Sequence, residues 1–573
     1  MRKLRSAIRE HLHFIAVATL LTLVMTFPTV LYLFRTDVMW LPIGSGNDAN
    51  HWDIWYWERL LRGLEARSYT NVIFYPEGVS LVHHPFLQQP AMLLRIFLQQ
   101  FMPLTNAFNI VFLMVIFSNA LAAYLYALWL FKDKWAALVA AVVFGFSPHA
   151  TNNPDQLHDA TMASIALAVY FFHRGIVEKK SLLVVAAGLM GGLTSTVSPY
   201  SFTCLMLTLA AVVVGFAIRR WRSLRFWRGI GLLALFTVMS SAPSIYPMMA
   251  NANGLEEALE FHANEQKHDL VSAFVNHENP LFGPPLNALL DTPADARISF
   301  TSYIGMVPLA LVCIGLFSGS TRRAMLPWLI LAAGFFVLRL GSTLSINGVA
   351  YPDILLPKYY LNEIFPSVFK SFNATKRFNI GFFLPFSLLA GYGVIALRAK
   401  MPQAARPLII LLLVGLIMVE YYTPIVDRVY NIKEFEYIDW LNRESADEIR
   451  LINVPMGRTN AKLYALHQAF NGFPHAAGSM SREPKSAYDY VRANSILNSW
   501  WTRAPLLCDV ATRDLYLSAL GRLESDGFSH VVFHQEARYR DLIADGLANA
   551  APSYRDDYVW IYRLEGLRES CPA

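Results

Sequence analysis

Charged residues are scarce in this sequence. Asp, Glu, Lys and Arg make up 16% of its 573 residues and hydrophobic residues 55%, which excludes an ordinary soluble protein. A strong excess of one charge is also missing, because the net charge is only +6. The basic residues gather in short stretches between apolar runs. This pattern indicates membrane topology and excludes nucleic acid as a partner.

Cysteine is rare as well. The sequence has four cysteines, and none forms a Cys-x-x-Cys motif or a Cys/His ligand spacing, which excludes the usual sequence signature of a zinc or dithiol redox site. Cys508 and Cys571 could form a disulfide if the C-terminal part of the chain is extracytoplasmic. Two free thiols are the alternative, and the spacing alone leaves both open.

Apolar stretches of spanning length recur from residue 12 to residue 422. We expect about 11 transmembrane helices, since a helix needs ~20 apolar residues to cross the hydrocarbon core. The expected spans lie near residues 12–34, 104–130, 135–150, 160–176, 182–197, 200–218, 229–249, 301–318, 325–340, 378–397 and 406–423. The sequence therefore predicts a polytopic α-helical membrane domain over residues 1–423.

Lys and Arg define the expected orientation. Four of them stand between positions 2 and 9, before the first span, and place the N-terminus in the cytoplasm. Alternating spans then put the strong basic cluster at 219–228 on the same side. The short loops expected outside, 148–160 and 197–200, contain no Lys or Arg. We expect a multi-pass protein of a bacterial inner membrane, with its C-terminal part periplasmic or extracellular.

Three long segments, 35–103, 250–300 and 341–377, are expected on the outer side. The first begins with a turn-rich stretch, 44–48, and continues in a helical stretch with several Trp residues, including Trp52. We expect these rings, and an amphipathic helix over 86–101, to lie at the membrane interface among membrane lipids.

The last part of the chain, 424–573, is mixed in composition and long enough to bury its own core. Short apolar runs bounded by polar residues predict strands, and longer periodic stretches predict helices. The strands are expected at 449–455, 530–533 and 558–562, and the helices at 512–525 and 537–548. The sequence thus predicts a soluble, extracytoplasmic α/β domain.

Acidic and basic residues gather at the expected outer ends of helices, where the phosphate of a lipid substrate would lie. They are Asp48 and Asp53 after the first span, Asp155, His158 and Asp159 in the second outer loop, and Lys376 and Arg377 at the tenth span. With the topology, this arrangement resembles the GT-C glycosyltransferases, which transfer a sugar from a polyprenyl-phosphate donor on the outer side of a membrane. The pieces Phe74-Tyr75-Pro76-Glu77-Gly78 and Ala390-Gly391-Tyr392-Gly393 are similar to a bacterial group of GT-C-like proteins.

The resemblance implies an inverting hexosyl- or pentosyltransferase with a glycan, lipid or protein acceptor. Asp48 would be the general base that takes the proton of the acceptor hydroxyl, and a helix N-cap is its alternative role. His51 would orient Asp48, and Asp53 would support it. An ordinary interfacial histidine and a structural carboxylate are the alternatives for these two residues.

The remaining candidates also have two readings each. Asp155, His158 and Asp159, spaced i, i+3, i+4, would share a helix face and orient the base or bind Mg²⁺ or Mn²⁺. A solvated loop at a helix start is the alternative. Lys376 and Arg377 would bind the donor phosphate, or snorkel to lipid headgroups. Because no Asp-x-Asp or Glu-x-Asp pair is seen, a metal requirement stays open, and we expect activity to survive chelation.

Two other classes of protein fit the same architecture. One is a lipid or polysaccharide transporter or flippase, and the other is a non-catalytic envelope-assembly factor. Against a transporter, no predicted span carries a charged residue at its centre, and no matched pair of Gly- or Pro-broken helices is seen. An assembly factor would keep the architecture without needing Asp48.

Overall fold

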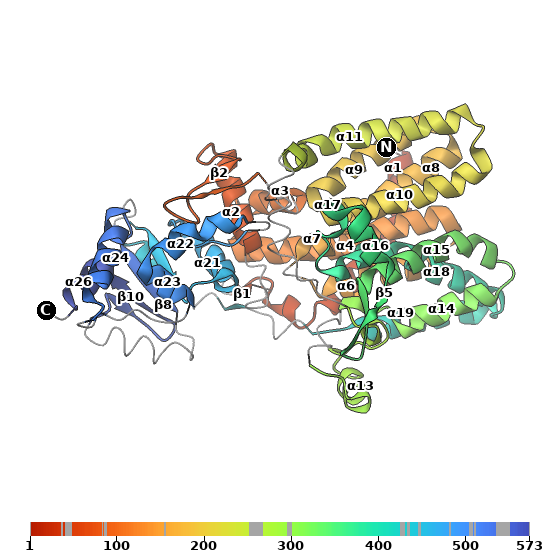
Figure 1. Cartoon of the computed structure of the whole chain (residues 1–573). Helices are drawn as coiled ribbons and strands as arrows, with labels where there is room; N and C mark the ends of the chain where they lie inside the picture. Colours follow the sequence, from red (N-terminus) through yellow and green to blue (C-terminus); the bar gives the residue numbers. More distant parts are fainter. Residues whose placement is uncertain are drawn as a thin grey trace. The chain divides into compact units, whose positions relative to one another are not determined.

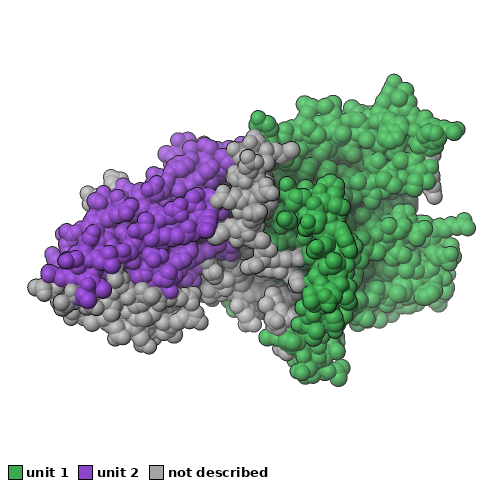
Figure 2. All heavy atoms as spheres, in the orientation of Figure 1, with its two compact units in different colours: residues 1–36, 86–246, 263–428 green, residues 37–85, 247–262, 429–573 purple. Residues whose placement is uncertain are grey.

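The structure is a computed structural model of the chain (Figure 1). It describes all residues except 1, 36–37, 40–48, 83, 85–88, 154–155, 251–267, 295–300, 425–429, 432–435, 445–448, 481–482, 503–507, 509–510, 535–549 and 572–573. The chain divides into two compact units (Figure 2). Unit 1 comprises Met1–Thr36, Phe86–Tyr246 and Ala263–Arg428, and unit 2 comprises Asp37–Pro85, Pro247–His262 and Val429–Ala573.

Unit 1 is a bundle of apolar helices. Its longer helices are α1 (Arg2–Met25), α4 (Leu104–Phe131), α5 (Lys134–Gly145), α8 (Ala163–Glu178), α9 (Ser181–Val197), α10 (Pro199–Arg220), α11 (Leu224–Ala250), α14 (Met306–Phe317), α15 (Arg322–Arg339), α18 (Asn379–Ala399) and α19 (Arg406–Tyr421). Each stretch that the sequence predicts as a span overlaps one of these helices.

The helices differ in how well they suit a membrane crossing. In the part of the chain that the structure describes, six helical stretches are long and apolar enough to cross a bilayer. They are Leu104–Phe131, Leu157–Glu178, Pro199–Ile218, Leu224–Pro247, Thr375–Ala399 and Gln403–Tyr421. Other apolar helices, α5 among them, are shorter than 18 residues. A multi-pass membrane protein is therefore confirmed, while the count of about 11 crossings stays a prediction.

Helix α18 lies at the centre of unit 1. Of its most apolar stretch, 83% is buried inside the protein, against 17% for α11. It packs against α5, α14 and α15. Gly393 allows the close approach of α14, because an added Cβ would overlap the main chain of Leu311. Small residues of this kind let helices in a membrane approach closely, so the glycine of the predicted Ala390–Gly393 motif has a packing role.

Short elements gather at one end of the bundle (Figure 1). Helices α6 (Pro148–Thr151) and α7 (Leu157–Ala160) connect α5 to α8, and the short helix η4 (Thr375–Phe378) leads into α18. The same end holds the hairpin of β4 (Thr343–Ile346) and β5 (Val349–Leu355), followed by α16 (Pro357–Ile364) and α17 (Pro366–Phe369). Amphipathic helix α3 (Gln89–Leu98) falls within the predicted interfacial stretch 86–101.

Unit 2 is built on a four-stranded sheet in the order β7-β8-β10-β9. Strands β7 (Leu451–Val454) and β8 (His530–His534) are parallel, whereas β10 (Val559–Arg563) pairs antiparallel with β8 and with β9 (Tyr554–Arg555). Helices α20 (Glu436–Leu441), α21 (Arg458–Asn471), α23 (Ser495–Thr502), α24 (Arg513–Ser525) and α26 (Leu564–Glu569) complete the unit. The predicted helix 537–548 lies outside the described residues.

Part of the predicted first outer segment belongs to unit 2. Helix α2 (Ala49–Leu61) packs on α21, and the Trp52 indole donates a hydrogen bond to Oε1 of Gln468 at 2.7 Å. Trp52 is 1% exposed, so its expected place at the membrane interface is wrong. Tyr75 of the predicted Phe74–Gly78 motif donates its amide hydrogen to the His475 carbonyl and its hydroxyl to the Asp526 carbonyl. The expectation for Trp52 failed because its partner, Gln468, is far away in the sequence.

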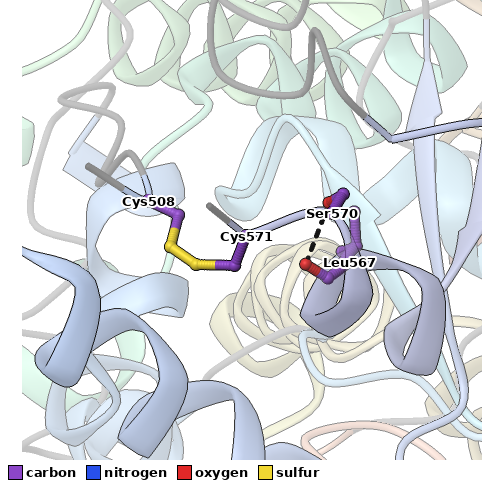
Figure 3. The surroundings of a disulfide bond; sticks show 4 residues. All are labelled: Cys508, Leu567, Ser570 and Cys571. Atoms are coloured by element: carbon purple, nitrogen blue, oxygen red, sulfur yellow. Dashed lines mark hydrogen bonds between the residues drawn. A yellow bond between two sulfur atoms is a disulfide. The ribbon is translucent and has the colours of Figure 1, made fainter. Parts of the chain in front are cut away.

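The two cysteines whose pairing the sequence leaves open form a disulfide (Figure 3). The Cα atoms of Cys508 and Cys571 are 5.7 Å apart. Cys571 stands two residues after the end of α26, so the bond anchors the C-terminal helix to the segment that precedes α24. Cys204 is a buried free thiol and Cys313 an exposed one.

The close contact at Gly393 gives a test of the bundle. Gly393→Val places a branched side chain against the α14 main chain, and such overpacking costs about 1–3 kcal/mol. The matched control is Gly415→Val in α19, where an added Cβ meets nothing within 4 Å. We expect Gly393→Val, but not Gly415→Val, to lower the thermal unfolding midpoint in detergent. Equal midpoints for the two variants would contradict this packing of α18.

Candidate functional site

Asp159 is the centre of a buried polar cluster in unit 1. Its side chain is 0% exposed, and its carboxylate lies 3.3 Å from His158 Nε2 and 3.5 Å from Arg377 Nε. Both distances exceed the ~2.9 Å of a usual N–H···O hydrogen bond. Arg377 therefore balances the carboxylate mainly by charge, as a buried carboxylate requires.

The main chain around Asp159 is held by helix α4. The Asn119 side chain donates to the Ala160 carbonyl at 2.7 Å, and its Oδ1 accepts the Met162 amide at 2.9 Å. Met162 directly precedes α8, so one buried amide ties together the end of α7 and the start of α8. Asp159 is thus fixed by its backbone as well as by its ion pair.

Arg377 comes from η4, directly before α18. Its guanidinium carbon lies 4.0 Å from the centre of the Tyr200 ring in the first turn of α10, a cation–π contact. Its Nη1 donates to Asn373 Oδ1 at 3.3 Å. Four segments of the chain therefore meet at this guanidinium: α7, the start of α10, the loop before η4, and η4 itself.

Lys376 lies beside this pair. Its ammonium group donates to Asn153 Oδ1 at 3.1 Å, and Asn153 in turn donates to the His149 carbonyl at 2.6 Å. Lys376 and His149 both interact electrostatically with the Asp159 carboxylate. The loop between α5 and α8 thus faces the start of α18 through charged and polar groups.

The start of α18 is fixed by a further cation. Buried Arg339, at the end of α15, donates to the Ser302 carbonyl and to Asn379 Oδ1, both at 2.9 Å. His268 pairs with the Ser302 hydroxyl at 2.9 Å. Burial lowers the pKa of His149 to about 4 and the pKa of His268 to about 3. Both imidazoles are therefore neutral near pH 7 and add no charge.

Among the described residues, the cluster carries more positive than negative charge. Lys376 and Arg377 supply two cations, and Asp159 supplies one carboxylate. Both cations lie in η4, which runs directly into α18, at the positive end of the helix dipole. A surplus of positive charge at a helix start suits an anion such as a phosphate.

Metal binding finds no support in the described residues. Among them, no group of three His, Cys, Asp or Glu side chains is placed to hold a metal ion. His158 and Asp159, two of the three predicted ligands, contact each other, and Asp159 also pairs with Arg377. Asp155, the third, lies outside the described residues. We derive no step through Mg²⁺ or Mn²⁺.

The other predicted residues fall into two groups. Asp48, the predicted base, lies outside the described residues. His51 and Asp53 are buried on α2 in unit 2, where Asp53 Oδ1 lies 2.6 Å from His84 Nε2. The structure therefore brings together His158, Asp159, Lys376 and Arg377 within unit 1. Whether Asp48 acts as a base stays a prediction.

Sequence reasoning missed several members of the cluster. Asn119 and Tyr200 are a polar and an aromatic residue in apolar helices, where many such residues only pack. Asn153 lies in the predicted outer loop, and its local signal was the concentration of polar residues between positions 147 and 159. Arg339 was hidden because it ends a predicted span, where a snorkelling cation is the common reading.

The comparisons with known proteins bear on the fold. No family model and no curated protein matches the sequence. A mutant form of the arabinofuranosyltransferase AftD from Mycobacteria superposes with a TM-score of 0.56 at 12% identity, over 96% of this chain and 41% of AftD. The oligosaccharyltransferase AglB from Archaeoglobus fulgidus, solved with an inhibitory peptide and a dolichol-phosphate, gives a TM-score of 0.47 at 12% identity, over 92% and 70% of the two chains.

The chain has a GT-C fold. The predicted resemblance is therefore confirmed at the level of architecture, and at 12% identity the AftD match shows the fold alone. This chain spans less than half the length of AftD. Within the GT-C fold of this protein, the described cluster of Asp159, Lys376 and Arg377 is built from α7 and from the short helix before α18.

The Asp159–Arg377 pair can be tested by a double-mutant cycle. Asp159→Asn leaves Arg377, whose side chain is 14% exposed, without its counter-charge. Breaking a buried pair costs about 3–5 kcal/mol, so the thermal unfolding midpoint should fall strongly. Asp159→Asn/Arg377→Gln should cost less than the sum of the single variants.

The control is Asp133→Asn, which removes the charge pair with Arg398 but keeps a side chain that can cap α5. This pair is more exposed than the Asp159 pair. Its loss should cost about 1 kcal/mol or less. Additive losses at Asp159 and Arg377 would show that the two side chains do not stabilise each other.

Proposed function

We propose that this protein is a membrane glycosyltransferase that moves a sugar from a polyprenyl-phosphate donor to an acceptor on the outer face of the membrane. Two observations support the proposal. AftD, which has the same type of fold, is named an arabinofuranosyltransferase. The observation that carries most weight is the cationic cluster at the start of α18, where, among the described residues, the cations Lys376 and Arg377 accompany one carboxylate, that of Asp159.

In the proposed reaction, the acceptor hydroxyl oxygen attacks the anomeric carbon opposite the donor phosphate. The bond between that carbon and the phosphate oxygen breaks, and the polyprenyl phosphate leaves with the electron pair. The configuration of the sugar is thereby inverted. Asp48 accepts the proton of the hydroxyl as general base. Lys376 and Arg377 stabilise the charge of the departing phosphate.

Asp159 and Tyr200 would act as positioning residues for Arg377. The carboxylate attracts Nε from 3.5 Å, and the guanidinium carbon lies 4.0 Å from the centre of the Tyr200 ring. A guanidinium held in this way needs no reorganisation when charge develops on the phosphate. Its two outer nitrogens match a pair of phosphate oxygens, which a lysine cannot reproduce.

The orientation belongs to the same proposal. A donor carried by a lipid on the outer leaflet requires the start of α18 and the C-terminal part of the chain to lie outside the cytoplasm of a bacterium. The Cys508–Cys571 disulfide supports this side, because structural disulfides persist in oxidising compartments.

The decisive experiment replaces Asp48. Asparagine caps a helix about as well as aspartate, so Asp48→Asn separates a base from a cap. If Asp48 is the base, the variant folds and inserts but loses ~10²-fold or more in turnover. The measurement is the transfer of a radiolabelled sugar from polyprenyl phosphate by the purified protein in reconstituted vesicles. The donor is the polyprenyl-phosphate sugar that accumulates in the lipids of cells whose gene for this protein has been deleted.

Two controls accompany this assay. Asp53→Asn changes another carboxylate, five positions further along the chain, and near-normal transfer is expected if its contact with His84 is structural. Arg377→Ala should weaken donor use more than Arg377→Lys, which keeps the charge. Full transfer in Asp48→Asn with a loss in Asp53→Asn would move the base to Asp53. If the wild-type protein transfers no sugar but moves the lipid-linked sugar across the vesicle membrane, a flippase is favoured instead.

Cysteine labelling tests the orientation independently of activity. In a Cys313→Ala background, Ser525→Cys at the end of α24 should react with an impermeant maleimide in intact cells. Ser525 is exposed, and so is Ser320 between α14 and α15, which the sequence predicts on the cytoplasmic side. Ser320→Cys should therefore react only after permeabilisation. The reverse pattern would invert the topology and remove the outer-face reaction.

A further inference from the structure

Unit 2 contains a cavity that the proposed reaction does not use. Its volume is about 630 Å³, within the range of ligand pockets in proteins. It lies at the amino ends of the parallel strands β7 and β8 and at the carboxyl end of β10, next to α24 and α26. All of its lining residues belong to unit 2.

The rim of the cavity carries paired charges. Arg563 Nη2 lies 2.5 Å from Glu444 Oε2, and Arg568 Nη2 lies 2.5 Å from Glu524 Oε2. Both arginine side chains are about half exposed, so their remaining nitrogens can reach a ligand. Glu565 adds a third carboxylate to the lining. The described lining residues therefore offer hydrogen-bond donors and acceptors side by side, and their three carboxylates and two guanidinium groups give a formal charge of one negative unit.

Apolar side chains contribute a small part of the cavity lining. Ile449, Phe528 and Leu564 are among the lining residues and are 3%, 4% and 1% exposed. His530 also lines the cavity, and burial lowers its pKa to about 4, so it is neutral near pH 7. Its Nδ1 shares a hydrogen bond of 2.8 Å with the Ser529 hydroxyl. A ligand in this cavity would meet small apolar patches next to charged groups.

This combination narrows the chemistry of the ligand. The negative rim disfavours a phosphate or a carboxylate, and its charged groups disfavour a purely apolar molecule. A sugar ring has an apolar C–H face and a belt of hydroxyl groups that both donate and accept. Neighbouring hydroxyls match the paired oxygens of a carboxylate and the paired nitrogens of an arginine.

The disulfide adds rigidity to one wall. Helix α26 supplies Leu564, Glu565 and Arg568, and Cys571 stands two residues after its end. The bond to Cys508 fixes the end of this helix, where Ser570 also donates its hydroxyl hydrogen to the Leu567 carbonyl at 3.0 Å (Figure 3). A wall that is fixed before the ligand arrives lowers the entropy cost of binding.

We infer that this cavity is a non-catalytic binding site for a neutral carbohydrate, formed by the Glu444–Arg563 and Glu524–Arg568 pairs next to the apolar side chains of Ile449, Phe528 and Leu564. The site would hold part of a glycan acceptor, and only that assignment rests on the proposed function. Binding of the sugar itself requires neither a donor nor the cluster around Asp159.

The test is sugar binding by the full chain in lipid nanodiscs, free of maltoside detergents, whose sugar headgroups would compete. The probes are the methyl glycosides of glucopyranose, galactopyranose, mannopyranose and arabinofuranose, and the corresponding disaccharides, measured by saturation-transfer NMR. At least one probe should bind. Arg568→Ala should weaken its binding at least about tenfold, since hydrogen bonds to charged groups are lost.

A second variant, Glu565→Gln, is not expected to disturb folding, because Glu565 is exposed and glutamine has nearly the same size as glutamate. It should also weaken binding, by about threefold or more. The matched control is Arg492→Ala, which removes an exposed arginine paired with Asp489 outside the cavity lining and should bind as the wild type does. Thermal unfolding of each variant reports whether it is folded.

Three outcomes would overturn the inference: no probe binds, both cavity variants bind like Arg492→Ala, or glucose 6-phosphate binds more tightly than glucose at this site. The inference is separable from the transferase proposal. Asp48→Asn should keep full sugar binding whether or not it transfers sugar. Transfer without sugar binding in the cavity would remove only the inference, and binding without transfer would remove only the proposed function.

Discussion

The burial of α18 is the constraint on which the rest of unit 1 depends. A helix that is apolar on all sides must be surrounded, and α5, α14 and α15 surround it. Gly393 brings α14 to backbone distance, and Arg339 fixes Asn379 at the other end of the helix. Because both ends are held, the residues that immediately precede α18 have a defined place. The positions of Lys376 and Arg377 are therefore set by the packing of α18.

Charge balance then decides what the start of α18 can bind. Asp159 could not remain ionised in a buried position without a cation, and Arg377 supplies it. The second cation, Lys376, leaves the described part of the cluster positive, while His149 and His268 stay neutral because burial lowers their pKa. A membrane protein gains little from a partly buried excess charge in the absence of a ligand. The excess positive charge of this cluster is reasonable if the protein binds an anion there when it functions.

Unit 2 is held together by contacts between distant parts of the chain. Gln468 is the central residue of this junction. Its Oε1 accepts from Trp52, and its Nε2 donates to the carbonyls of Val72 and Phe473, both at 2.6 Å. All hydrogen-bonding groups of one buried amide are therefore used to join the segment after α1 to the C-terminal sheet. The same unit presents a cavity with paired charges, so it combines a rigid scaffold with a polar concave surface.

The sequence by itself determined the local structure. Apolar runs located every helix of the bundle, because a bilayer tolerates only backbone that satisfies its own hydrogen bonds. The apolar stretches around Ile452, Val532 and Ile561 marked the positions of strands β7, β8 and β10. The charged residues Asp159, Lys376 and Arg377 were visible because polar groups are rare at the ends of such helices.

The tertiary structure alone decided which of these residues meet. Lys376 contacts Asn153 across a sequence separation of 223 residues, and Trp52 contacts Gln468 across 416. Helical periodicity and strand alternation carry information over a few residues, so they could not show that Asp53 pairs with His84 or that Trp52 is buried in unit 2. Those outcomes depend on how whole helices pack, which follows from side-chain shape and charge over the complete chain.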